Sequence, residues 1–156
     1  MPFWRRKKED DWVRPEPPAE VLLGTVGYVR NDVVKPRPHG WEKVESRLEF
    51  LPEHEARLAG IEGYSHLIVV TYLDVAADAL EKPETLTLAS GNAYGIFATR
   101  SQLRPNHLGV SVVELLGRDG TVVGVRGLDA IDGTPVLDVK PYLPEYDSVP
   151  EAAIPR

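Results

Sequence analysis

Cysteine is absent from this chain of 156 residues, which excludes disulfide bonds, thiolate metal sites and a thiol nucleophile. Long apolar runs are absent as well, since none approaches the roughly 18 residues that a membrane-spanning helix needs. The basic residues Arg5 to Lys8 have no apolar segment after them, so the sequence predicts no secretory signal. Together these absences predict a soluble cytoplasmic protein with no membrane segment.

Extended helical patterns are scarce, whereas turn residues are abundant. The 14 prolines and 13 glycines argue against a helical bundle. No Gly-x-Gly-x-x-Gly run occurs and strands do not alternate with long helices, so a Rossmann-type domain is not expected. Hydrophobic residues make up 42% of the chain, which is typical of a globular protein.

Several short segments have the residue pattern of β-strands. The predicted strands cover residues 21–30, 44–50, 65–73, 94–100 and 110–116. Residues 65–73 form a continuous apolar run, which predicts a strand buried on both faces. Asp119-Gly120 separates two β-rich runs and predicts a hairpin with a type I′ turn. With one or two short helices, at 52–58 and 76–80, the pattern indicates a mainly β fold, an antiparallel barrel or sandwich.

Charge is uneven along the chain. Residues 1–20 carry five basic and five acidic side chains among several prolines, so the net charge of −6 belongs to residues 21–156. We therefore predict an N-terminal tail (1–20) outside the core, one domain (21–148) and a C-terminal tail (149–156).

The densest polar cluster lies between two predicted strands, over residues 97–111. Arg104 precedes Pro105, which favours extended backbone, and Pro105-Asn106 suits a turn. Such a loop offers donors, including Arg100, for a carboxylate or phosphate. The alternative is a polar connection whose arginines are solvated.

A second polar cluster covers residues 128–142. In a strand that begins at Pro135, Val136, Asp138 and Lys140 are expected on one face, opposite Leu137 and Val139. Asp138 and Lys140 then pair or point together into a cleft; the alternative is a hairpin turn followed by an edge strand. The spacing of the three aspartates matches no calcium loop, so no metal site is predicted.

His66 stands at the start of the most apolar predicted strand. Its position predicts a buried, hydrogen-bonded histidine. The other histidines lack metal-ligand spacing, and no Ser-His-Asp arrangement can be argued.

Two of these segments resemble the signature motifs of the TsaA-like family, the TrmO-type (YaeB) tRNA methyltransferases. They are residues 95–111 (GIFATRSQLRPNHLGVS) and 128–142 (LDAIDGTPVLDVKPY). Residues 58–66 (LAGIEGYSH) and 24–30 (GTVGYVR) are similar to its earlier segments. Only Arg37, in Pro-Arg-Pro-His, corresponds to the Pro-Arg-Gln element of the family's cofactor pocket. The resemblance covers roughly residues 22–148.

The resemblance implies a small single-sheet antiparallel β-barrel that binds S-adenosyl-L-methionine as a homodimer and methylates tRNA. The implied target is N6 of N6-threonylcarbamoyladenosine at position 37, and no metal is expected because the cofactor's sulfonium is already activated. The expected cofactor-binding residues are Arg100, Ser101, Arg104, Asn106, Asp132, Gly133, Thr134, Asp138 and Lys140. Substrate contacts are expected from Arg104, Lys140 and Tyr142. Asp138 or His66 is the expected proton acceptor.

Two other functions stay open at this point. One is a non-catalytic barrel that binds the cofactor or RNA, and the other is a methyltransferase with a different substrate. A tRNA partner requires positive surface, for which Arg100, Arg104, Arg118, Arg126 and the run Arg5 to Lys8 are candidates. The alternative for that run is a solubilising tail.

Overall fold

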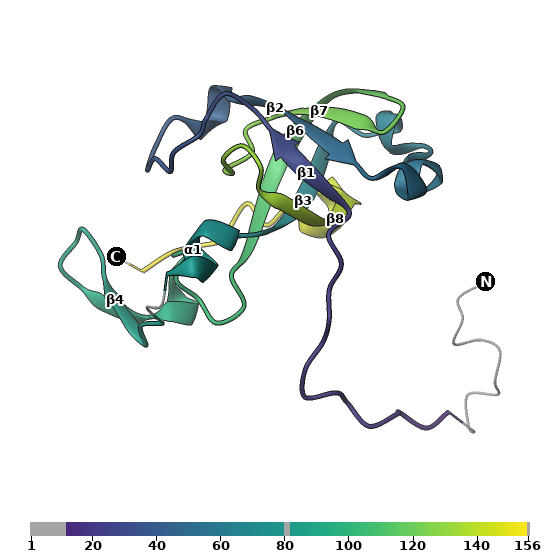
Figure 1. The fold of residues 1–156 in the computed structure, drawn as a ribbon. Helices are drawn as coiled ribbons and strands as arrows, with labels where there is room; N and C mark the ends of the chain where they lie inside the picture. The colour runs from purple at the N-terminus through teal and green to yellow at the C-terminus, as the bar shows by residue number, and fades with distance from the viewer. Residues whose placement is uncertain (1–11, 80–81, 156) are drawn as a thin grey trace.

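The computed structural model describes residues 12–79 and 82–155, and six of its strands form a closed barrel (Figure 1). The barrel strands are β1 (Gly27–Arg30), β2 (Glu45–Phe50), β3 (His66–Tyr72), β6 (Leu108–Asp119), β7 (Val122–Arg126) and β8 (Pro135–Pro141). They follow the order β1-β2-β7-β6-β3-β8, and β8 closes on β1, with every pair antiparallel. The predicted mainly β barrel is therefore confirmed.

The remaining elements are short. The 3-10 helices are η3 (Trp41–Lys43), η4 (Pro52–Leu58), η5 (Ile61–Gly63) and η6 (Ile96–Ala98). The α-helices are α1 (Asp74–Asp78) and α2 (Pro144–Asp147), and β4 (Thr85–Thr87) pairs with β5 (Ala93–Gly95) in a separate hairpin. Among the described residues, no helix has the length and apolar character needed to cross a bilayer.

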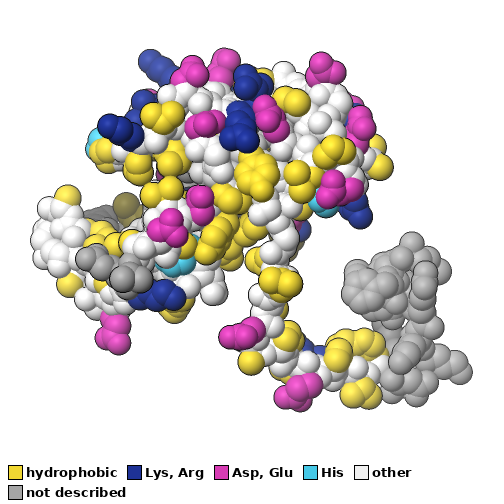
Figure 2. All heavy atoms as spheres, in the orientation of Figure 1, with side chains coloured by type: hydrophobic (Ala, Val, Ile, Leu, Met, Phe, Trp, Pro, Cys, Tyr) yellow, Lys and Arg dark blue, Asp and Glu magenta, His cyan; other side chains and the backbone are white. Residues whose placement is uncertain are grey.

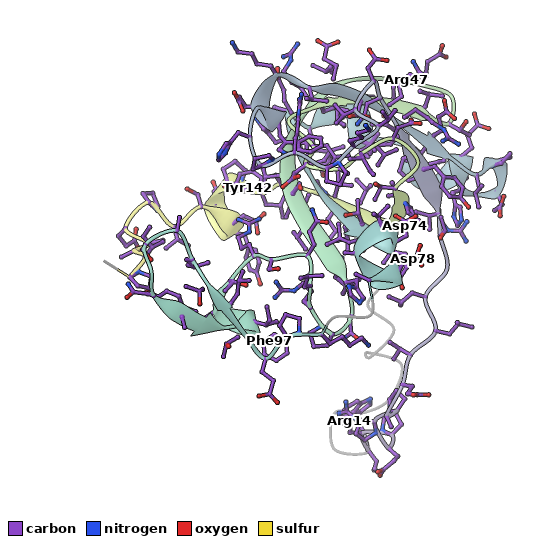
Figure 3. The ribbon with its side chains drawn as sticks, turned by 60° about the vertical axis from the view of Figure 1, so that its left-hand side comes forward. Arg14, Arg47, Asp74, Asp78, Phe97 and Tyr142 are labelled. Atoms are coloured by element: carbon purple, nitrogen blue, oxygen red, sulfur yellow. The ribbon has the colours of Figure 1, made fainter. Side chains whose placement is uncertain are left out.

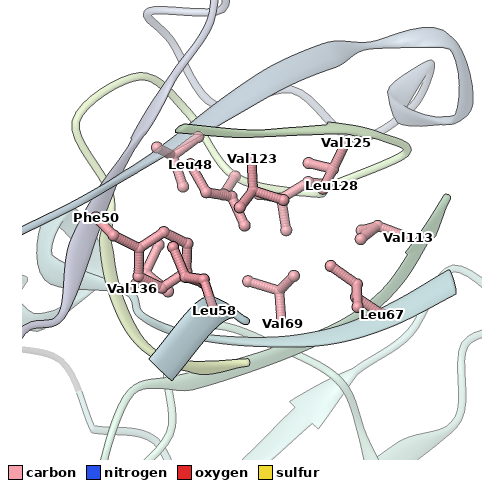
Figure 4. Close-up of a cluster of buried hydrophobic side chains, with 12 residues drawn as sticks. Leu48, Phe50, Leu58, Leu67, Val69, Val113, Val123, Val125, Leu128 and Val136 are labelled. Carbon is pink, nitrogen blue, oxygen red and sulfur yellow. The ribbon is translucent and has the colours of Figure 1, made fainter. Parts of the chain in front are cut away.

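Alternation along the strands builds the core inside the barrel (Figure 4). In β2, Ser46, Leu48 and Phe50 point inward and are buried, while Glu45 and Arg47 are exposed. The core consists of Val29, Leu48, Phe50, Leu58, Leu67, Val69, Val113, Val123, Val125, Leu128, Ala130 and Val136. Leu58 comes from η4, so the predicted short helix at 52–58 forms as a 3-10 helix and contributes to the core.

The structure corrects three expectations about strands. Residues 94–100 do not form one strand, because β5 ends at Gly95 and η6 follows. β3 alternates between buried and partly exposed residues, so only one of its faces is buried. The outer face of a barrel strand can stay exposed to solvent, because no second layer of strands or helices has to cover it. β1 begins at Gly27, later than the predicted strand at 21–30.

One turn and one bulge also differ from the sequence-based expectations. The β6–β7 register pairs Asp119 with Val122, which places Gly120 and Thr121 at the tip of the hairpin. Only Gly120, with φ of 59°, has a positive φ there, as in a type II′ rather than a type I′ turn. The register between β3 and β8 shifts so that Val70 faces Asp138 while Thr71 faces Val136. The shift turns Val136 into the core, away from the face of Asp138 and Lys140.

The N-terminal segment runs away from the barrel as an extended chain (Figure 1). Its residues from 12 to 24 are exposed, including Leu22 and Val21. The basic run Arg5 to Lys8 lies outside the described residues, so its predicted role stays a prediction.

Candidate functional site

The longest strand leaves one edge uncovered beside the barrel. β6 pairs with β3 through residues 108–114, but β7 pairs only with residues 114–119. Within the described part of the chain, residues 108–113 therefore have a strand partner on one side only. The Arg100 guanidinium reaches this open edge and donates a hydrogen bond to the Val110 carbonyl over 3.1 Å.

The loop between η6 and β6 is held by its own polar side chains. The Thr99 hydroxyl donates to the Ile96 carbonyl, and the Ser101 and Leu103 backbone N–H groups donate to the Thr99 and Ser101 hydroxyls. The Arg104 guanidinium donates to the Thr99 and Ser101 carbonyls at 3.1 and 3.0 Å. These contacts show that Ser101 and Arg104 fix the shape of the loop.

His107 ends this loop in a strained position. It has φ of 50°, which non-glycine residues rarely adopt, and its side chain is buried. The ring Nδ1 lies 3.2 Å from the Gln102 carbonyl, and the His107 carbonyl accepts a hydrogen bond from Leu73 N–H. His66, in contrast, is exposed, with Nδ1 2.8 Å from the Ser65 hydroxyl. The prediction of a buried His66 is therefore wrong, because the strand begins at the barrel rim.

An open cleft of about 690 Å³ lies between this loop and the uncovered edge of β6. Its walls are Leu73, Thr99, Arg100, Gln102, Arg104, Leu108, Gly109, Val110, Ser111 and Asp129. A small cavity continues from it, sharing Leu73, Gln102 and Asp129 and adding Asp74, Pro36 and Trp41. Gly109 allows β6 to lie close to the Thr71 side chain of β3, because a Cβ there would stand 2.6 Å from the Thr71 hydroxyl.

Charges of both signs face the cleft, from Arg100, Arg104 and Asp129. Desolvation raises the pKa of the Asp129 carboxyl, and the positive charge of Arg100 opposes that rise. A cation on one wall and a carboxylate on the other suit a ligand that carries both signs of charge. Leu73, Leu108 and Val110 supply apolar surface beside them. The cleft thus combines apolar surface with placed polar groups, which fix the orientation of a ligand in small-molecule sites, although its walls are more polar than is usual for such sites.

The other predicted site residues lie in three different places. Asn106 lines a neighbouring open groove with Tyr72 and Leu108. Asp132, Gly133 and Thr134 form the turn before β8. There Asp132 accepts from Asn31 N–H at 3.1 Å, Gly133 has φ of 86°, and the buried Thr134 hydroxyl donates to Ile131. Thr134 also lines the small cavity, so this turn borders the cavity that adjoins the cleft.

The predicted residues on β8 and at the start of β3 do not line the cleft. Asp138 and Lys140 are exposed on β8, with 3.7 Å between carboxylate and ammonium. The His66 and Tyr142 rings meet edge to face at 6.4 Å. His66 lies at the end of β3 that is far from the cleft, whereas Asp138 pairs with Val70, whose other neighbour is Val110 of the cleft wall. β3 therefore lies between Asp138 and the cleft. Figure 3 shows Tyr142 well apart from Asp74.

Asp129 and Gln102 are the residues to which sequence reasoning assigned no role. Both lie inside the quoted motifs, but Asp129 follows β7 and Gln102 precedes β6, so only the fold brings them together. Arg118 and Arg126 were candidates for contact with RNA, but the structure places both of them in ion pairs. Arg118 pairs with Glu62 at 2.9 Å, and Arg126 pairs with Glu45 and Glu114 at 2.9 and 2.7 Å. Their charges are thus already matched by carboxylates.

Residues 29–148 match the tRNA-methyltransferase O N-terminal domain family. The chain belongs to this family. The likeness predicted from residues 95–111 and 128–142 is confirmed, since both segments fall within the match.

Known proteins also resemble the chain over most of its length. A probable S-adenosyl-L-methionine-binding protein of Archaeoglobus fulgidus is 45% identical over 139 residues, covering 86% of this chain and 37% of the relative. A tRNA (adenine(37)-N6)-methyltransferase of Escherichia coli is 40% identical over 100 residues, covering 60% and 43%. The crystal structure of TrmO from Pseudomonas aeruginosa has a TM-score of 0.73 at 31% identity, covering 89% and 62%. The chain spans less than two thirds of each of these three relatives.

Asp129 allows a test of whether its carboxylate stabilises the fold. Because the folded-state pKa of this carboxyl is raised, its ionisation costs stability above that pKa, and the cost vanishes below its ordinary value of 3.8. We expect Asp129→Asn to raise the melting temperature at neutral pH, with the gain shrinking as the pH falls. Thermal unfolding monitored by circular dichroism across this pH range measures the difference. A variant that is less stable than the parent at neutral pH would show that the carboxylate supports the fold.

Proposed function

We propose that the protein binds S-adenosyl-L-methionine in the cleft and transfers its methyl group to N6 of an adenine in tRNA. The observation that carries the proposal is the presence of opposite charges, Arg100 and Asp129, on a cleft of mixed polar and apolar surface in a TrmO-family barrel. The printed names of the relatives, which include S-adenosyl-L-methionine binding and tRNA (adenine(37)-N6)-methyltransferase activity, support the same assignment.

The cleft residues fit the chemistry of this cofactor. Arg100 can donate to its carboxylate, because a guanidinium binds carboxylates through charge-assisted hydrogen bonds. Asp129 offers the negative charge for its ammonium or sulfonium, and Leu73, Leu108 and Val110 offer apolar surface for its adenine. The volume of about 690 Å³ falls in the range of about 300–1,000 Å³ that is usual for ligand pockets.

When bound, the cofactor supplies a methyl group on a sulfonium that is already activated, so we propose that no metal takes part. The chain holds the donor and excludes water at the cleft, and such positioning contributes about 7–11 kcal/mol to rate enhancement in favourable cases. The N6 proton leaves once the new C–N bond forms. The positions of Asp138 and His66 do not support a role for either as its acceptor, because neither lines the cleft.

The finer substrate proposal is N6-threonylcarbamoyladenosine at position 37 of tRNA, in the cytoplasm. An anticodon-loop base is unpaired and can leave the stack to enter a pocket, which is how proteins usually read RNA sequence. Calorimetric titration with S-adenosyl-L-methionine after EDTA treatment tests the cofactor step. We expect one site per chain with unchanged affinity after chelation. Binding that appears only with added metal would contradict the metal-free proposal, and no binding in either condition would contradict the cofactor assignment.

We also propose that the protein is a homodimer, joined through the outer face of β6 and β3. Val112 is 52% exposed there, on the same face as Tyr72. Leu108 and Val110 of this face also line the cleft, so the interface would adjoin the cofactor site. Light scattering should give twice the chain mass, and Val112→Glu should shift the mass towards the monomer, since charge opposes burial at an interface. Val149→Glu, at another exposed valine, is the matched control. A monomer mass for the unmodified protein at working concentrations would contradict the dimer.

A further inference from the structure

The connection between β1 and β2 is held rigidly at the entrance of the small cavity. The Arg37 guanidinium lies over the Trp41 ring, 5.0 Å from its centroid. Arg37 also donates to the Gly40 carbonyl, and the Trp41 indole N–H donates to the Arg37 carbonyl, both at 3.0 Å. Gly40 adopts φ of 86°, which glycine tolerates without strain. The connection therefore keeps its shape through contacts that involve neither of its lysines.

Lys35 and Lys43 are the lysines of this connection, and both are exposed. Within residues 12–79 and 82–155, neither has a carboxylate within ion-pair distance. The arginines on the adjoining strands differ, since Arg30 and Arg47 both lie near Glu49. The two lysines thus carry charge that the described part of the protein leaves unmatched.

Their position relates them to the cleft. Lys35 directly precedes Pro36 and Lys43 follows Trp41 by two residues, and Pro36 and Trp41 line the cavity that shares Asp129 with the cleft. In Figure 2, Lys and Arg side chains gather at the upper left, over the tip where Figure 1 places this connection. Arg100 lines the adjoining cleft. Cations therefore lie both beside the cavity and in the cleft that it joins.

The charge inside the opening is of the other sign. Asp74 and Asp129 line the cavity, which favours a cationic group and repels phosphate. A polyanion that presents one base to the cleft must therefore place its backbone on the rim, where Lys35 and Lys43 lie. Among the described residues, Arg118 and Arg126 are less suited to this role, because both are paired with glutamates.

We propose that Lys35 and Lys43 bind backbone phosphates of the RNA strand whose base enters the cleft. This assignment rests on the proposed function and adds the surface that holds the substrate. Lysine contacts to phosphate carry no sequence information, but they set the position of the strand and make affinity depend on salt.

The test compares the double variant Lys35→Gln/Lys43→Gln with Arg57→Gln, which removes an exposed charge on η4, away from the cleft. The affinity of each protein for tRNA is measured by fluorescence anisotropy over a series of salt concentrations. Each lost single-strand phosphate contact lowers the slope of log K against log salt by about 0.7, so the double variant should lose about 1.4 and bind about 25-fold more weakly near 0.1 M salt. Arg57→Gln should bind as the unmodified protein does.

Calorimetry with S-adenosyl-L-methionine separates this proposal from the function on which it rests. The double variant should keep the affinity for the cofactor and the melting temperature of the unmodified protein. If the unmodified protein binds and methylates tRNA while the double variant has the same salt slope, the role of the lysines is overturned and the proposed function stands. If the unmodified protein binds no RNA, both are overturned.

Discussion

Arg100→Gln should weaken S-adenosyl-L-methionine binding about ten- to 150-fold. The guanidinium is exposed on the cleft wall, where a charge-assisted hydrogen bond to a ligand is worth about 1.5–3 kcal/mol. Methyl transfer at low cofactor concentration should fall by a similar factor, whereas the melting temperature should change little. Glutamine keeps part of the side-chain length and removes the charge, so the change reports on the charge.

Arg57→Gln is the matched control for this experiment. Arg57 is also exposed and also donates to one backbone carbonyl, that of Glu53, but it lies on η4 rather than on the cleft. Its replacement should leave cofactor affinity unchanged. Calorimetry on both variants decides the question: equal cofactor affinities for Arg100→Gln and the unmodified protein would exclude Arg100 from the site.

Among glycine-to-alanine substitutions in the barrel strands, Gly27→Ala should cause the largest loss of stability. Gly27 is buried in β1 opposite Phe50, and a Cβ there would stand 2.6 Å from the Glu49 carbonyl oxygen and 3.0 Å from the Phe50 Cα. Both neighbours are backbone atoms, so β1 and β2 must separate. Overpacking of this kind costs about 1–3 kcal/mol or more, which corresponds to a melting temperature lower by about 2–12 °C for a chain of this size.

Gly24→Ala provides the comparison, because nothing lies within 4 Å of a Cβ at that position. Its free energy of unfolding should lie within about 0.5 kcal/mol of that of the unmodified protein, as is usual for surface substitutions. Thermal unfolding of the two variants measures the effect. Equal melting temperatures would show that β1 and β2 can move apart at little cost.

The fold could be predicted from local patterns where one residue type repeats along a strand. Alternation in residues 44–50 predicted β2, and the apolar run at 65–73 predicted β3, whose bounds are His66–Tyr72. Patterns failed where long-range pairing decides the outcome. The bulge opposite Val70 and Thr71 turns Val136 inward, and no feature of residues 135–141 alone signals it.

The site was predictable in part for the same reason. Arg100 could be found because it lies in a dense polar loop between two strands, and the structure places it on the cleft. Asp129 could not be assigned a role from the sequence. Its proximity to Arg100 depends on β7 ending opposite Glu114, which leaves the first residues of β6 without a partner on that side. His66 was misread as buried because an apolar run does not show where a strand leaves the barrel rim.

The methyl-transfer claim is tested most directly by mass spectrometry of tRNA nucleosides. Unmodified protein is incubated with tRNA that carries N6-threonylcarbamoyladenosine and with S-adenosyl-L-methionine bearing a deuterated methyl group. The account predicts that this nucleoside gains one deuterated methyl group at position 37, and that Arg100→Gln slows its appearance at low cofactor concentration. A label that appears on another nucleoside would contradict the substrate, and no label on any nucleoside, despite cofactor binding, would show a binding protein rather than a methyltransferase.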